Sequence, residues 1–172
     1  MKLMRLSERL GYRGKSSSEK GSMISIGESY AVWTALVWRY DAIADTMILL
    51  TFAKDEDLKI IIKDGLGVLE AHKEQLEKLT KEFGIPMPGR PPDEANVAID
   101  INVVTDQFIF RQIYIGIADS LFKHLSYYQR SHGSYLREYF RKAFQEELQL
   151  YDEFYEYGKQ KSYLHEPPSF RR

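Results

Sequence analysis

Cysteine is absent from this chain of 172 residues. This absence excludes disulfide bonds, thiolate metal sites and cysteine nucleophiles. An excess of charge of one sign is also missing, because 24 basic and 25 acidic side chains leave a formal net charge of -1. So small a net charge creates no general field that would attract nucleic acid, and we expect no nucleic-acid partner.

Long hydrophobic runs are missing too. No uninterrupted apolar stretch reaches the roughly 18 residues that a membrane-spanning helix needs, and the N-terminus lacks the apolar core of a signal peptide. We therefore expect no membrane insertion and a cytoplasmic location. The sequence also lacks convincing strand patterns, glycine-rich phosphate loops and serine-nucleophile elbows. It therefore contains none of these common motifs from which a reaction could be identified.

The sequence does contain apolar residues repeated at helical spacing, which predicts four long helices. They span about residues 25–53, 56–83, 102–130 and 135–161. Asp55 fits the N-cap of the second helix, because its carboxylate can accept from the free amides of the first turn. The second helix has the most regular apolar face, with one polar break at His72. This face consists of Leu58, Ile62, Gly65, Leu69, His72, Leu76, Leu79 and Phe83.

The first and fourth helices carry similar apolar faces, whereas the third is apolar nearly all round. The face of the first helix consists of Trp33, Val37, Tyr40, Ala44, Met47 and Thr51. That of the fourth consists of Leu136, Phe140, Ala143, Glu147, Leu150, Phe154 and Tyr157. The fourth helix has a second aromatic row at Phe144, Tyr151 and Tyr155. That row, and a third helix without a polar face, predict burial against another subunit in a homodimer.

A proline-rich segment, residues 84–101, separates the two helix pairs and contains four of the six prolines. Extended chain of this length reaches roughly 50 Å at about 3.1 Å per residue. The flanking helices are only about 40 Å long. The segment can therefore run the full height of a bundle, which makes the second and third helices parallel. The predicted fold is an all-α, four-helix ferritin-like bundle with one long crossover between helices 2 and 3.

A flexible tether between two helical hairpins is the alternative, although each hairpin would be small for a core of its own. We assign residues 25–161 to the bundle and residues 162–172 to a C-terminal tail. Residues 1–24 carry six basic and two acidic side chains and a Gly/Ser-rich patch, which predicts a basic flexible N-terminal arm. A solvated terminus is the simpler interpretation of this arm, and a partner-binding arm is the other.

The spacing of the histidines excludes one kind of metal site. Ferritin-like bundles can bind two metal ions through Glu-x-x-His motifs, since side chains three positions apart project inward together. The residues three positions before the four histidines are Leu69, Leu121, Gln129 and Ser162. No Glu-x-x-His motif is present, and we do not expect the full di-iron site or its oxidase and iron-storage chemistry.

A smaller polar cluster is still predicted in the core. At about 1.5 Å per residue, His72, Asp119 and Glu147 fall at nearly the same height in the bundle. Buried polar groups need partners. One interpretation is a hydrogen-bonded cluster in which His72 pairs with Glu147, and Arg39 pairs with a carboxylate. The other is a single divalent metal ion, such as Fe, Mn or Zn, bound by His72, Asp119 and Glu147. We favour the cluster without a cofactor.

Several short segments resemble a known family. They are Trp33-Thr34 with Arg39-Tyr40, Phe52-Ala53-Lys54-Asp55, Phe83-Gly84-Ile85-Pro86-Met87-Pro88 with Arg90-Pro91-Pro92, Phe108-Ile109-Phe110-Arg111, and Glu146-Glu147. Over about residues 27–168 the chain resembles a ferritin-like family of uncharacterised bacterial proteins related to spore coat protein F. The resemblance implies a ferritin-like fold, a cytoplasmic or spore-coat location and coat proteins as partners. Related sequences can carry an acidic residue in mid helix 1, where this chain has Ala44, which argues against a metal site.

Three functions are consistent with these features. The first is a non-enzymatic structural or interaction protein, associated with the spore coat. The second is a metal-binding redox protein that uses a reduced ferritin-like site in the bundle core. The third, small-molecule binding in the core, requires a cavity. We favour the first, since 12 tyrosines and 9 phenylalanines are more than one inward face of the bundle can bury.

Overall fold

A computed structural model of the chain describes residue 11, residues 14–90 and residues 104–164. This part of the chain has five helices and no strand. The helices are α2 (Ser17–Gly21), α3 (Ile26–Phe52), α4 (Glu56–Glu82), α5 (Asp106–Arg130) and α6 (Ser134–Gln160). The predicted all-α fold is confirmed. Parts of the expected N-terminal arm (1–10 and 12–13), crossover (91–101) and tail (165–172) lie outside the described residues.

Three of the four long helices begin at a side chain that caps the first turn. Ser25, Asp55 and Thr105 each accept a hydrogen bond from the backbone amide three residues further on. Such caps satisfy amides that have no partner within the helix. At the other end of α4, Gly84 has a φ of +64°, a left-handed conformation that glycine adopts without strain. The helix boundaries therefore follow from local sequence.

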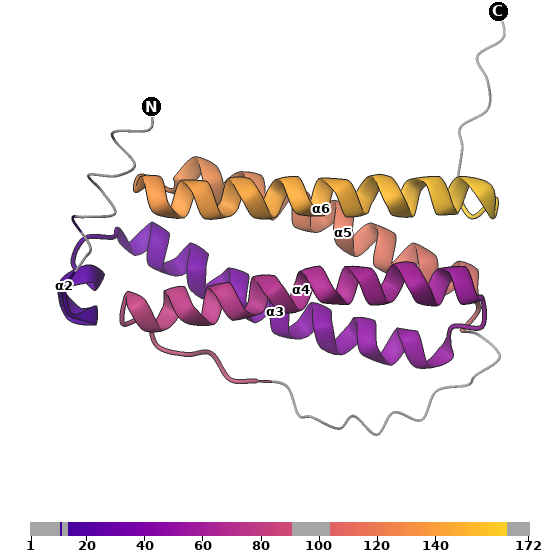
Figure 1. The fold of residues 1–172 in the computed structure, drawn as a ribbon, viewed down its shortest axis with the longest axis horizontal. Coiled ribbons are helices and arrows are strands. Elements are labelled where there is room, and N and C mark those ends of the chain that lie inside the picture. The colour runs from indigo at the N-terminus through magenta and orange to yellow at the C-terminus, as the bar shows by residue number, and fades with distance from the viewer. Residues whose placement is uncertain (1–10, 12–13, 91–103, 165–172) are drawn as a thin grey trace, which may run out of the picture.

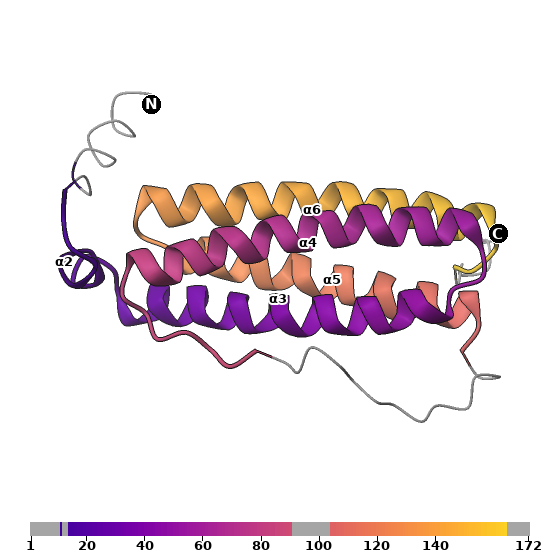
Figure 2. The ribbon, with the colours of Figure 1, turned by 60° about the horizontal axis from the view of Figure 1, so that its bottom comes forward.

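Figures 1 and 2 show the four long helices packed side by side, with the short α2 at one end. α3 and α4 are antiparallel, as are α5 and α6, whereas α4 and α5 both run from right to left in Figure 1. At one end, Glu28 accepts hydrogen bonds from the amides of His132 (2.8 Å) and Gly133 (2.9 Å). At the other end, the Lys161 ammonium donates to Asp55 at 2.7 Å. These contacts join the two helix pairs at both ends of the bundle.

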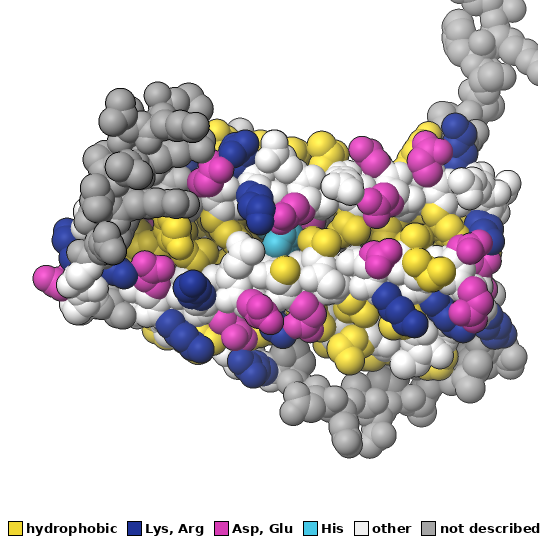
Figure 3. All heavy atoms as spheres, in the orientation of Figure 1, with side chains coloured by type: hydrophobic (Ala, Val, Ile, Leu, Met, Phe, Trp, Pro, Cys, Tyr) yellow, Lys and Arg dark blue, Asp and Glu magenta, His cyan; other side chains and the backbone are white. Residues whose placement is uncertain are grey.

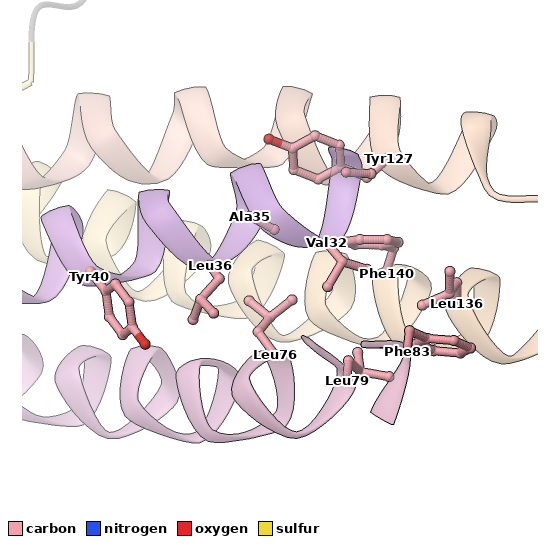
Figure 4. Close-up of a cluster of buried hydrophobic side chains, with 11 residues drawn as sticks. Val32, Ala35, Leu36, Tyr40, Leu76, Leu79, Phe83, Tyr127, Leu136 and Phe140 are labelled. Carbon is pink, nitrogen blue, oxygen red and sulfur yellow. The ribbon is translucent and has the colours of Figure 1, made fainter. Parts of the chain in front are cut away.

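The core contains two separate groups of buried hydrophobic side chains. One lies where α3 begins and α4 ends (Figure 4). It consists of Ala31, Val32, Ala35, Leu36, Tyr40, Leu76, Leu79, Phe83, Tyr127, Leu136 and Phe140. The other, towards the opposite end, consists of Ala53, Leu58, Ile62, Val104, Ile109, Phe110, Phe154 and Tyr157. The layer between the two groups holds buried polar side chains.

The predicted inward face of α6 is buried at every position, and that of α4 is buried or half-buried throughout. The face predicted for α3 is wrong except at Tyr40 and the half-buried Val37 and Ala44. Trp33 and Met47 are exposed, and the residues that pack inward come from a neighbouring face. That face is Ala31, Val32, Ala35, Leu36, Arg39, Tyr40 and Ile43. Its alanines let α3 approach both α4 and α5 closely, which a face with tryptophan would prevent.

The outer surface is mixed. On the side seen in Figure 3, charged side chains of both signs flank a strip of hydrophobic side chains between α6 and α4. None of the described helices combines the length and the apolar character that crossing a bilayer requires.

Candidate functional site

Five buried polar side chains meet in the layer between the two hydrophobic groups. They come from all four long helices and are Arg39 (α3), His72 (α4), Ser120 and His124 (α5) and Glu147 (α6). Each is at most 3% exposed. Each occupies a position that its helix turns toward the core, where a hydrophobic residue would otherwise pack. We call this set the core polar cluster.

Glu147 is the centre of the core polar cluster. The Arg39 guanidinium forms an ion pair with one carboxylate oxygen, and the Ser120 hydroxyl donates to the other. The His124 Nε2 atom lies 3.1 Å from the oxygen that Arg39 contacts, and Arg39 also contacts this nitrogen. The His72 Nδ1 atom is 3.6 Å from the same oxygen. Both carboxylate oxygens therefore have partners inside the protein.

His72 also connects the cluster to the protein surface. Its Nε2 atom lies 2.8 Å from a carboxylate oxygen of Glu146, whose other oxygen pairs with Lys142 at 3.1 Å. Burial alone would raise the pKa of Glu146, but the hydrogen bonds from His72 and Lys142 outweigh it and lower the pKa. An ionised Glu146 accepts the Nε2–H of a neutral His72, which leaves Nδ1 as an acceptor facing Glu147.

The two imidazoles are neutral at physiological pH. Burial, and after it the charge of Arg39, lowers the pKa of His72 to about 4. Burial, followed by the charge of Arg39, holds the pKa of His124 well below its usual range. Burial also lowers the pKa of Arg39, to about 10, so the guanidinium remains charged. The cluster is therefore one buried ion pair with two neutral imidazoles, a state whose stability depends on every partner being present.

Three polar atoms of this cluster have no hydrogen-bond partner among the described residues. They are Arg39 Nε, His72 Nδ1 and His124 Nδ1. A buried polar atom without a partner costs free energy, on the order of 1–3 kcal/mol. Such atoms have unused capacity to bind something else.

Of the three candidate site residues predicted from the sequence, two lie in the core polar cluster. The structure brings His72 and Glu147 together and leaves Asp119 on the exposed side of α5, outside the cluster. Asp119 has the right height along the bundle, but its neighbour Ser120 faces the core instead. The partnership of Arg39 with a carboxylate is as expected, since Arg39 pairs with Glu147.

Sequence reasoning missed His124 and Ser120. They are four residues apart and so lie on one face of α5. That spacing was the available signal, but α5 is apolar nearly all round, so the pattern did not indicate which face is inward.

Three members of the cluster offer donor atoms of the kinds that bind transition metals. One atom each from His72, His124 and Glu147 lie within 4.8 Å of one another, and all three residues are buried. The Arg39 guanidinium contacts His124 Nε2 and Glu147 Oε1. A metal ion at these atoms would have to displace that guanidinium or accept a second positive charge beside it.

A cavity of about 370 Å³ lies next to the cluster, between α3 and α5. Arg39, Ser120 and Glu147 form part of its wall. Much of the remaining wall is hydrophobic or small, including Ala42, Ile62, Leu69, Ile113, Gly116 and Ile117. Pockets of this size and composition are typical of small-molecule sites. The cavity that the third of our hypotheses requires is therefore present.

The chain is similar to a protein family of unknown function and to a solved structure. The family described as "Protein of unknown function (DUF3231)" matches residues 15–172. The crystal structure of a "putative spore coat protein" from Bacillus halodurans C-125 has a TM-score of 0.80 and 23% sequence identity. The match covers 87% of this chain and 96% of that one. At this identity the likeness shows a shared fold. A search of curated proteins found no match.

Proposed function

The chain belongs to the DUF3231 family, and from this premise we propose that it is a non-enzymatic structural or interaction protein associated with the spore coat. The fold shared with the Bacillus halodurans protein supports the location in the coat. Synthesis in the cytoplasm and assembly with coat proteins follow from this proposal.

The observation that carries this proposal is the ion pair between Arg39 and Glu147 at the centre of the core. Arg39 and Ser120 engage both oxygens of the carboxylate. A carboxylate fixed in this way, beside histidines that are neutral, acts as a structural bond between helices. It resembles the buried networks that specify one packing arrangement.

A ferritin-like class of bundle is part of the same proposal. It is supported by the parallel course of α4 and α5 (Figure 1) and by the antiparallel pairing within each half. A bundle with one long crossover has this arrangement.

Self-association as a homodimer is the second part. α5 presents the large hydrophobic side chains Ile115 (55% exposed), Phe122 (75%) and Leu125 (43%) to the outside. Large exposed apolar side chains on one helix are typical of subunit interfaces. In the aromatic row of α6, Tyr151 stacks on Tyr114 of the same chain, with ring centroids 4.8 Å apart. The support for a dimer therefore comes mainly from α5.

Fractionation of sporulating cells of the encoding organism tests the coat association. We expect quantitative mass spectrometry to find the protein enriched in the alkali-extracted coat fraction over the core lysate, with a cytoplasmic enzyme as the control for carry-over. A coat-to-lysate ratio no higher than that of the cytoplasmic enzyme would contradict the proposal.

A metal-binding redox protein is the second candidate function, and the proximity of donor atoms on His72, His124 and Glu147 favours it. In this case Zn²⁺, Mn²⁺ or Fe²⁺ should raise the melting temperature in a concentration-dependent way. His124→Leu should abolish the rise. Asp119→Asn is the matched control, since Asp119 lies outside the cluster. Stoichiometric metal that survives dialysis in the unaltered protein would favour this function over the first.

A further inference from the structure

The cavity between α3 and α5 differs in polarity between its two ends. At the inner end are Arg39, Ser120 and Glu147, all buried. The residues of its wall that are exposed mark the opening, and they include Asp41 and Asp45. Hydrophobic side chains from all four helices lie between the two ends. A ligand that fills this space needs an apolar body.

The opening is acidic. Asp41 and Asp45 are four positions apart on α3, so their carboxylates project from the same side of the helix. Neither forms an ion pair within the described residues. The nearby Lys123 ammonium lies over the ring of Trp38, 3.3 Å from its centroid. Two carboxylates without an ion-pair partner among the described residues, beside an apolar cavity, favour a cation at the opening.

The inner end is electrically balanced, because Glu147 neutralises Arg39. In the described part of the chain, the Nε atom of Arg39 nevertheless has no hydrogen-bond partner, although the side chain is 2% exposed and lines the cavity. A charged group of a ligand at the inner end would be attracted by one of these two side chains and repelled by the other. The inner end therefore disfavours a charged head group, and a neutral acceptor is the polar group that could satisfy the free N–H.

We propose that this cavity binds a hydrophobic amine, with the apolar body between α3 and α5 and the ammonium group at Asp41 and Asp45. The inference concerns a site that the proposed coat function does not use, so either can fail without the other. A carboxylic acid of the same shape would meet two like charges at the opening. A neutral alcohol would gain the apolar contacts but no ion pair.

Titration calorimetry with n-octylamine, 1-octanol and octanoate separates these ligand classes. All three ligands have eight carbon atoms in an unbranched chain, so they differ in the polar group at its end. At neutral pH we expect saturable binding of one octylamine per protein molecule, roughly tenfold tighter than octanol, since the ammonium group gains ion pairs with Asp41 and Asp45. Octanoate should bind more weakly than octanol. Equal affinity for octanoate and octylamine, or no saturable binding up to about 1 mM, would overturn the proposal.

Two charge variants test the opening. Asp41→Asn with Asp45→Asn should lower octylamine affinity about tenfold and leave octanol affinity unchanged. The matched control is Asp64→Asn with Glu74→Gln, which removes the same charge from exposed positions of α4. An equal loss in both double variants would show a general field effect and contradict a site at the opening.

Two glycine variants test the cavity itself. A Cβ atom at Gly116 would meet nothing within 4 Å, and Gly116 lines the cavity, so Gly116→Leu should fill it. Gly67 has equally open space but lies outside the cavity, on α4. Gly116→Leu should abolish binding of both octylamine and octanol, while Gly67→Leu should retain it. Circular dichroism and melting curves would check that both variants fold. Full binding by a folded Gly116→Leu variant would place the ligand elsewhere and refute this site.

Discussion

The Arg39 guanidinium and the Glu147 carboxylate form an ion pair in the middle of the bundle, from positions 108 residues apart in the chain. Both side chains are 2% exposed. The pair joins the first long helix to the last. Because the pair is buried, removal of one partner leaves the other charge unpaired in the core. That costs more free energy of unfolding than the loss of an exposed ion pair.

Arg39→Met should lower the free energy of unfolding by about 3–5 kcal/mol, because it leaves Glu147 charged and unpaired in the core. Arg90→Met is the matched control. Arg90 pairs with Glu77 at 2.8 Å but is largely exposed, so its loss should cost less than about 1 kcal/mol. Urea denaturation of the two variants measures the difference, and similar midpoints would contradict a buried ion pair.

His72→Leu and Glu147→Leu should differ in cost although they contact one another. His72→Leu removes a hydrogen bond from Glu146, which is partly exposed and can turn to water, so we expect a loss of about 1–2 kcal/mol. Glu147→Leu strands Arg39 and should cost about 3–5 kcal/mol. Combining the two should not restore stability, because Arg39 stays unpaired. Recovery in the double variant would show that His72, and not Arg39, is the principal partner of Glu147.

Stability should fall as the pH drops from about 6.5 to about 4. The pKa of His72 is about 4 in the folded protein and near 6.5 in an unfolded chain, so in this window the unfolded state binds a proton that the folded state does not. The contribution of neutral His72 to the free energy of unfolding is complete above pH 6.5. As the pH falls toward 4, roughly 3 kcal/mol of it is lost. His124 shifts in the same direction and adds to the loss.

Denaturation curves across this range check the pH dependence. His72→Gln should flatten it, and His132→Gln, at an exposed position, should leave it unchanged. A slope that is the same in all three proteins would contradict a contribution from His72. The carboxylates whose pKa is lowered, such as Glu28, lose their contribution below about pH 4.5.

Phe122→Ser should shift the proposed dimer toward monomer. Phe122 is the most exposed large hydrophobic residue of α5, and a polar side chain there removes apolar area from the expected interface. Ile60→Ser, at a residue 57% exposed on α4, is the control that should leave the dimer intact. Light scattering of the unaltered protein at a single monomer mass of 20.1 kDa, at high micromolar concentration, would contradict the dimer.

Gly158→Ala and Gly67→Ala should have opposite effects. A Cβ atom at Gly158 would overlap the ring of Phe110, which packs in the core, so we expect a loss of about 1–3 kcal/mol. At Gly67 the added Cβ meets nothing within 4 Å, and alanine should stabilise α4 by up to about 1 kcal/mol. Thermal melting of the two variants checks the signs. An unchanged melting temperature in Gly158→Ala would show that α6 can move away from Phe110.

The sequence by itself determined the helices and the height of the cluster. Asp55 and Gly84 delimit α4 through local capping chemistry, which needs no tertiary contact. The polar residues His72 and Glu147 could be recognised in the sequence because each interrupts an otherwise apolar helix face. The rise per residue of a helix then predicts their height in the bundle.

Only the tertiary structure decided which side of α3 and α5 faces inward. Both helices are apolar on several sides, so periodicity alone allowed Trp33 as a core residue and Asp119 as a cluster member. In the folded chain Trp33 and Asp119 are exposed, and Ala35 and Ser120 take the inward positions. The rotation of a helix about its axis depends on how closely its small residues let two neighbours approach, and that distance is a property of the packed bundle.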